Sequence, residues 1–119
     1  MECTVKHSVR EEEGIVLIEL EGDVLGLPDA RSLGDLIRTL IQDNKNDVML
    51  DISRVELMNS SGLGILISAL TSVRKAGGDL VLVNITDRIK NLLSITKLNS
   101  IIHVCDSVND AKVYFKERD

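Results

Sequence analysis

Hydrophobic and polar positions follow two different periods along this chain, and each change of period marks a new element. Short, almost wholly apolar runs are typical of strands that are covered on both faces. A polar first run, 4–10, and an apolar second run, 15–20, flank a polar turn at 11–14, which predicts a two-stranded hairpin. The predicted strands are 4–10, 15–20, 48–52, 80–83 and 101–105.

Between the later strands, apolar residues recur every three or four positions, which is the helical period. Pro28 suits a first helical turn, Gly77 and Gly78 end the second helix, and Ser107 with Asp110 resembles a capping box. The predicted helices cover about 28–43, 61–76, 86–97 and 107–115. The order ββαβαβαβα predicts an α/β fold, a mixed and mainly parallel sheet of about five strands with four helices.

Composition narrows the class of protein. A chain of 119 residues with 44% apolar residues fits a single domain, 1–119, whose core is aliphatic because aromatic residues make up 2%. A net charge of −5 without a basic stripe disfavours direct contact with nucleic acid or an anionic membrane. Neither a membrane-spanning run nor a signal peptide is evident, so we expect a cytoplasmic protein.

Metal and cofactor chemistry also find no support in the sequence. Cys3 and Cys105 have no companion Cys or His at ligand spacing, which argues against a zinc site and a disulfide framework. We therefore predict reduced thiols, no metal and no cofactor.

The most unusual strand-to-helix junction is 58–64, Met-Asn-Ser-Ser-Gly-Leu-Gly. Such junctions often carry function in open α/β sheets. Each glycine in a helix costs up to about 1 kcal/mol relative to alanine, so Gly62 and Gly64 are expected to permit the close approach of another backbone. Chemistry alone favours an ordinary N-cap, worth about 1 kcal/mol, at Asn59 or Ser60.

Enzyme motifs at this junction are incomplete. The run from Gly62 to Ile67 lacks the third glycine of a dinucleotide fingerprint, and Met58 replaces the first glycine of a hydrolase elbow. A nucleophilic Ser60 would need a base, yet His7 and His103 belong to other predicted strands. Asp51 lacks the companions of a receiver domain and is interpreted as a strand-end hydrogen-bond acceptor. The sequence therefore predicts a protein that is not an enzyme.

Residues 51–66 resemble the signature of the STAS family, specifically bacterial anti-sigma factor antagonists, and 20–23, 77–80 and 92–98 support the resemblance. It implies that Ser60 is phosphorylated by an anti-sigma factor serine kinase and restored by a serine phosphatase. The unmodified protein would bind the anti-sigma factor and release the sigma factor. The implied partner-binding residues are Asp23, Asn59, Ser60, Ser61, Gly62, Leu63 and Gly64.

Two departures from the family pattern leave alternatives open. Asn59 stands where many members carry aspartate, and the loop 24–28 lacks polar residues that are common there. A second hypothesis is therefore a constitutive STAS scaffold or subunit of a lipid-transport or stress-signalling complex. A third, a nucleotide or small-molecule binder at the glycine-rich turn, lacks a complete phosphate cradle.

Overall fold

The computed structural model describes residues 6–23 and 27–118, and it confirms the predicted order of strands and helices. The strands are β1 (Lys6–Glu12), β2 (Ile15–Glu21), β3 (Asp47–Arg54), β4 (Asp79–Val83) and β5 (His103–Cys105). The helices are α1 (Leu27–Gln42), α2 (Ser60–Lys75), α3 (Asp87–Ile95), the 3-10 turn η1 (Leu98–Ser100) and α4 (Val108–Arg118).

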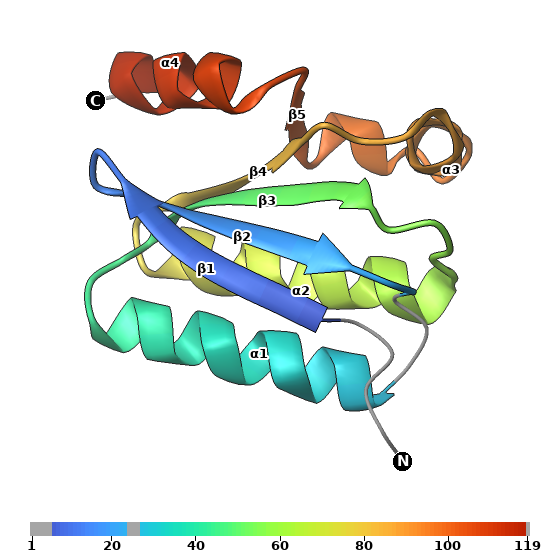
Figure 1. Ribbon diagram of the computed structural model, residues 1–119, viewed down its shortest axis with the longest axis horizontal. Helices are drawn as coiled ribbons and strands as arrows, with labels where there is room; N and C mark the ends of the chain where they lie inside the picture. The colour runs from blue at the N-terminus through green and yellow to red at the C-terminus, as the bar shows by residue number, and fades with distance from the viewer. Residues whose placement is uncertain (1–5, 24–26, 119) are drawn as a thin grey trace.

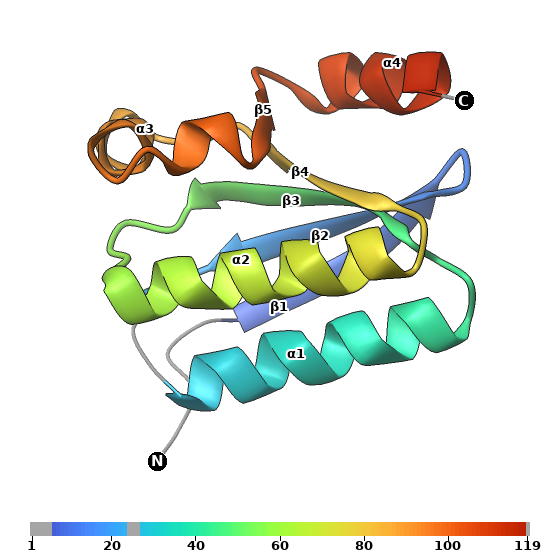
Figure 2. The same ribbon diagram turned by 180° about the vertical axis from the view of Figure 1, so that it is seen from behind.

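The five strands form one mixed sheet in the order β1-β2-β3-β4-β5. β1 is antiparallel to β2, and the remaining neighbours are parallel, as the crossover helices require. Helices α1 and α2 pack side by side against one face, while α4 lies over the other (Figures 1 and 2). The parallel strands thus end at a common edge, where the helices that follow them begin.

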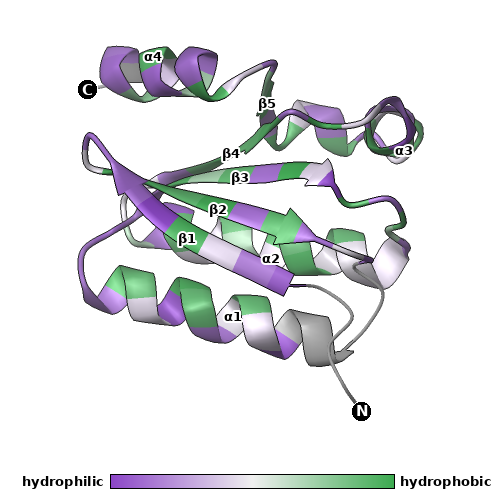
Figure 3. Ribbon diagram, in the orientation of Figure 1, coloured by the Kyte–Doolittle hydropathy of each residue, from purple (hydrophilic) through white to green (hydrophobic). Residues whose placement is uncertain are grey.

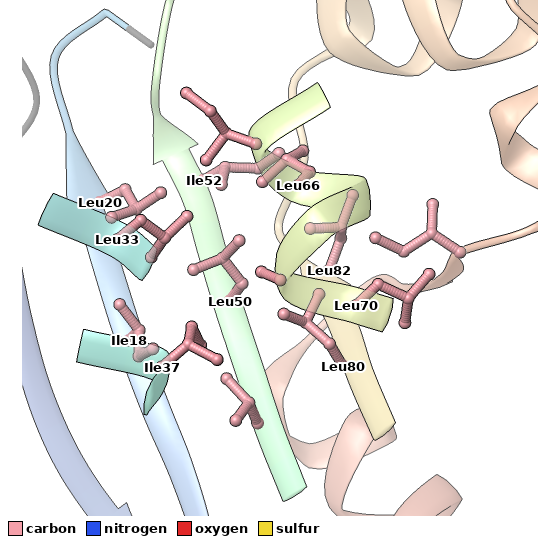
Figure 4. Close-up of a cluster of buried hydrophobic side chains, with 14 of the residues drawn as sticks. Ile18, Leu20, Leu33, Ile37, Leu50, Ile52, Leu66, Leu70, Leu80 and Leu82 are labelled. Atoms are coloured by element: carbon pink, nitrogen blue, oxygen red, sulfur yellow. The ribbon is translucent and has the colours of Figure 1, made fainter. Parts of the chain in front are cut away.

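The larger core fills the space between the sheet and helices α1 and α2. Alternate side chains of β2, β3 and β4 point toward the two helices, and all of them are almost fully buried (Figure 4). A smaller cluster under α4 uses the opposite side chains of the same strands. Residues labelled in the larger core are Ile18, Leu20, Leu33, Ile37, Leu50, Ile52, Leu66, Leu70, Leu80 and Leu82.

The hairpin at the edge of the sheet has a two-residue turn and a charged outer strand, β1. Glu13 and Gly14 form its turn with φ values of 55° and 80°, the left-handed backbone that two-residue hairpin turns prefer. β1 is largely exposed and mixed in hydropathy, whereas β3 and β4 carry more apolar residues (Figure 3). Charged side chains on an edge strand discourage pairing with other chains, so β1 closes the sheet on this side.

The apolar run 101–105 is a strand over only its last three residues, so the prediction was wrong at its start. Lys97 adopts φ 62° after α3, and the N–H groups of Ile101 and Ile102 both donate to the carbonyl of Leu98. Ile102 is 2% exposed and belongs to the larger core. Burial in the core just after the 3-10 turn therefore explains Ile102, whereas Ile101 is 45% exposed and neither residue belongs to the strand.

Asp79 is a buried carboxylate that connects three elements. It accepts hydrogen bonds from Tyr114 Oη at 2.6 Å, the N–H of Leu80 at 2.8 Å and Arg74 Nε at 3.2 Å. Burial disfavours the charged form, but these bonds and the charge of Arg74 outweigh it and hold the pKa of Asp79 below its ordinary value. Asp79 thereby attaches α4 and the end of α2 to the start of β4.

Two further predictions concern membrane-spanning helices and the two cysteines. No helix in the ranges 6–23 and 27–118 is both long and apolar enough to cross a membrane. Cys105 is a buried free thiol, and burial is the main reason that its pKa is raised. Cys3 lies outside the described residues.

Candidate functional site

The junction singled out in the sequence lies at the edge where β2 and β3 end and α1 and α2 begin (Figure 1). The N–H of Gly22 donates to the carbonyl of Arg54 at 3.1 Å, which joins the two strand ends. Asp23 follows Gly22 directly and therefore lies at this same edge of the sheet, where it is half-buried. Residues 24–26 of the loop considered above lie outside the described residues.

Two buried residues, Val55 and Met58, hold the connection from β3 to α2 in the core. Val55 is fully buried and its N–H donates to the carbonyl of Ile52, while Met58 is 9% exposed in the core. Leu57, between these anchors, leaves 45% of its surface exposed. Leu57 was not predicted as a site residue, and the signal for it in the sequence is its place in the short segment that connects β3 to α2.

Asn59, and not Ser60, is the N-cap of α2. It has extended backbone angles, φ −101° and ψ −173°, and its Oδ1 accepts a hydrogen bond from the N–H of Gly62 at 2.9 Å. Its carbonyl accepts the first helical bond, from Leu63. Asparagine and aspartate cap helices about equally well, so Asn59 retains the capping role without the negative charge.

Ser60 and Ser61 are the first two residues of α2, and both are exposed. Because Asn59 takes the cap position, the hydroxyl of Ser60 has no capping role; it makes no hydrogen bond to another residue in the described part of the chain. The first turn of α2 contains no acidic residue, and its N–H groups give this end a positive potential. The site can therefore accept a negative group on Ser60.

The two glycines of the junction differ in their surroundings. Gly62 is buried and Gly64 is exposed. A Cβ added at Gly64 would meet no atom within 4 Å, so the backbone that this glycine was expected to admit does not belong to the protein's own fold. Gly64 instead leaves the surface of α2 bare one turn after Ser60.

The predicted partner-binding residues are brought to one edge, but not all of them face solvent. Asn59, Ser60, Ser61 and Gly64 are exposed. Leu63 is 5% exposed and belongs to the larger core, so its side chain serves packing. The predicted partner-binding set covered every residue from Asn59 to Gly64 and did not divide them into exposed and buried positions.

Asp51 is a strand-end hydrogen-bond acceptor, as predicted. Its Oδ1 accepts from the N–H of Ser53 at 2.9 Å, and its Oδ2 accepts from Asn84 Nδ2 at 3.1 Å. The first bond lies within β3, and the second joins β3 to the end of β4. The two histidines lie on outer strands, His7 in β1 and His103 in β5, with β3 between them in the sheet.

The model of the STAS domain family matches residues 6–111. A Thermotoga neapolitana protein named as an anti-sigma factor antagonist and TM1081 homolog is 36% identical over 66 residues, 56% of this chain and 58% of that protein. The anti-sigma-B factor antagonist of Staphylococcus aureus is 26% identical over 104 residues, 87% of this chain and 94% of that protein.

The solved structures give the same assignment of fold. An anti-sigma factor antagonist from Mycobacterium paratuberculosis superposes with a TM-score of 0.81 at 21% identity, covering 100% of both chains. The family match spans nearly the whole sheet and the helices between its strands. The chain therefore belongs to the STAS domain family.

Proposed function

We propose that this chain is an anti-sigma factor antagonist whose unphosphorylated form binds a kinase-type anti-sigma factor and so frees a sigma factor. Phosphorylation of Ser60 ends this binding, and a serine phosphatase restores it. The observation that carries the proposal is an exposed Ser60 at the start of α2 whose capping role has been taken by Asn59. The names of the relatives in Thermotoga and Staphylococcus support the same function.

The helix start favours a reversible phosphate. A phosphoserine carries a charge of about −1.5 to −2, and a negative group at a helix N-terminus gains about 0.3–1 kcal/mol. Asn59 in place of aspartate removes one repulsive charge beside this group. Phosphorylation should therefore leave the fold intact and change the charge of the surface that the partner meets.

Gly64 gives the partner access to Ser60. The exposed residues of the junction form a low surface, since Gly64 has no side chain and even a Cβ at this position would have no neighbour within 4 Å. Leu57 adds exposed apolar area beside it. We include Leu57 with Asp23, Asn59, Ser60, Ser61 and Gly64 in the proposed partner surface, with Gly62 and Leu63 as its support.

The direct test is phosphorylation in vitro by a kinase-type anti-sigma factor encoded near this chain. The protein is incubated with this kinase, ATP and magnesium, and the modified residue is mapped by mass spectrometry. Ser60→Ala should abolish incorporation, whereas Ser61→Ala, a matched change at the next exposed serine, should retain it. Incorporation that persists in Ser60→Ala would contradict the assignment.

Binding is measured with the same partner and the variant Ser60→Asp. We expect binding at least tenfold weaker, while the thermal midpoint stays within a few degrees because Ser60 is exposed. If no nearby kinase modifies or binds the chain and transporter subunits are recovered with it, the scaffold or lipid-transport hypothesis replaces this one.

A further inference from the structure

A second concave site lies away from Ser60, at the β5 edge of the sheet. It is an open cleft of about 700 Å³ between α3, η1 and β5, completed by the end of α2 and by Tyr114 of α4. Sites for small organic ligands occupy about 300–1,000 Å³, so the volume suits one ligand. Figure 2 shows α3, β5 and α4 following one another along this side of the molecule.

The charge of the cleft is opposite to that of the chain. The protein carries a net charge of −5, yet the cleft is lined by the cations Arg74 and Lys90, and no Asp or Glu is among its described lining residues. Its other polar groups are uncharged amides and hydroxyls together with the imidazole of His103. They are supplied by Asn91, Ser94, Asn99 and Ser100.

The two cations differ in how they are held. Arg74 is fixed by hydrogen bonds from Nε to Asp79 and from Nη2 to the carbonyl of Ile101, and the carboxylate offsets its charge. Lys90 is exposed on α3 and forms no ion pair within the described residues. Lys90 is therefore the cation available to a ligand, and Arg74 shapes the wall beside it.

The remaining wall is apolar and partly flat. Leu93 and Ile102 are each 2% exposed and form its base, while Ile101 is 45% exposed at the cleft. His103 stacks on Tyr114 with ring centroids 4.1 Å apart and an interplanar angle of 18°. A flat, apolar body can pack against these groups while an anionic group reaches Lys90.

We propose that this cleft binds a small organic anion, a molecule with one carboxylate, phosphate or sulfonate group attached to a flat apolar body. The site is separate from the phosphorylation site. Ser60 and Arg74 lie at opposite ends of α2, about 21 Å apart along the axis at 1.5 Å per residue. Binding therefore does not require the function proposed for Ser60.

The test uses 8-anilino-1-naphthalenesulfonate as the probe and the full chain labelled with ¹⁵N. In a titration followed by two-dimensional amide NMR, we expect saturable shifts confined to 90–94, 99–104 and their neighbours. N-phenyl-1-naphthylamine, which has the same rings without the sulfonate, should bind at least fivefold more weakly. Shifts centred on another surface, or no saturation at millimolar probe, would overturn the proposal.

The charge contribution is tested with two variants of one helix. Lys90→Glu should weaken probe binding at least fivefold, while Arg88→Glu, an exposed residue of α3 outside the cleft, should change it less than twofold. Lys90→Gln, which removes the charge without reversing it, should weaken probe binding by an intermediate factor. This neutral variant serves as a control for a folding defect caused by the reversed charge. Equal effects of Lys90→Glu and Arg88→Glu would refute a specific contact.

Discussion

The capping bond at the start of α2 gives the sharpest test of the site geometry. Asn59→Ala removes the bond from the Gly62 N–H to Oδ1, which is 2.9 Å long. Loss of an N-cap costs about 0.5–2 kcal/mol, and Gly62 is buried, so water cannot fully replace the lost acceptor. We expect the free energy of unfolding to fall by about 1–2 kcal/mol.

The measurement is urea unfolding followed by circular dichroism, together with the thermal midpoint. For a domain of this size, 1 kcal/mol corresponds to about 3–6 °C. Ser60→Ala should change stability by less than about 0.5 kcal/mol because Ser60 is not the cap, and Asn59→Asp should stay equally close to wild type. If Ser60→Ala proves more destabilising than Asn59→Ala, the cap has been assigned to the wrong residue.

Three other changes test the fold around the two sites. Gly64→Ala should raise the free energy of unfolding by up to about 1 kcal/mol in urea, because the position is helical and open, yet weaken binding of the anti-sigma factor in calorimetry. Gly78→Ala should lower stability by about 1–3 kcal/mol or more, because its Cβ would lie 1.9 Å from the carbonyl oxygen of Asn46; a Gly78→Ala variant as stable as wild type or as Gly64→Ala would refute the clash. The pKa of Asp79 is lowered in the folded protein, so the stability that its charged form contributes is fully present above the ordinary pKa of 3.8. That stability is lost as the pH falls through the pKa of the folded state. The free energy of unfolding of Tyr114→Phe, measured from pH 7 to pH 3, should therefore approach that of wild type at the acidic end. A difference between the two proteins that stays constant over this range would contradict the lowered pKa of Asp79.

The sequence predicted most of the secondary structure because periodicity reports directly on burial. The runs at 48–52 and 80–83 became β3 and β4, whose side chains are covered on both faces. The helical stripe of α2 and its end near Gly77 were also predicted. Local patterns suffice where a residue's environment depends on its nearest neighbours in the chain.

Predictions failed where burial came from distant segments. The run 101–105 reads as a strand, but Ile102 is buried at a 3-10 turn that packs into the main core. The end of the second helix at Gly77 and Gly78 was predicted correctly, but the close contact of Gly78 with the carbonyl of Asn46, from the segment before β3, was not. Both facts depend on which segments the sheet brings together.

By itself, the sequence determined the order of elements, the strand-to-helix position of Ser60 and the resemblance that makes it a phosphorylation candidate. The tertiary structure decided that Asn59 caps α2, that Gly64 is open while Leu63 is buried, and that Arg74 and Lys90 line one cleft. The physical reason is that periodicity records which side of an element is buried. Which atoms meet there depends on the crossovers that place distant segments at the same edge of the sheet.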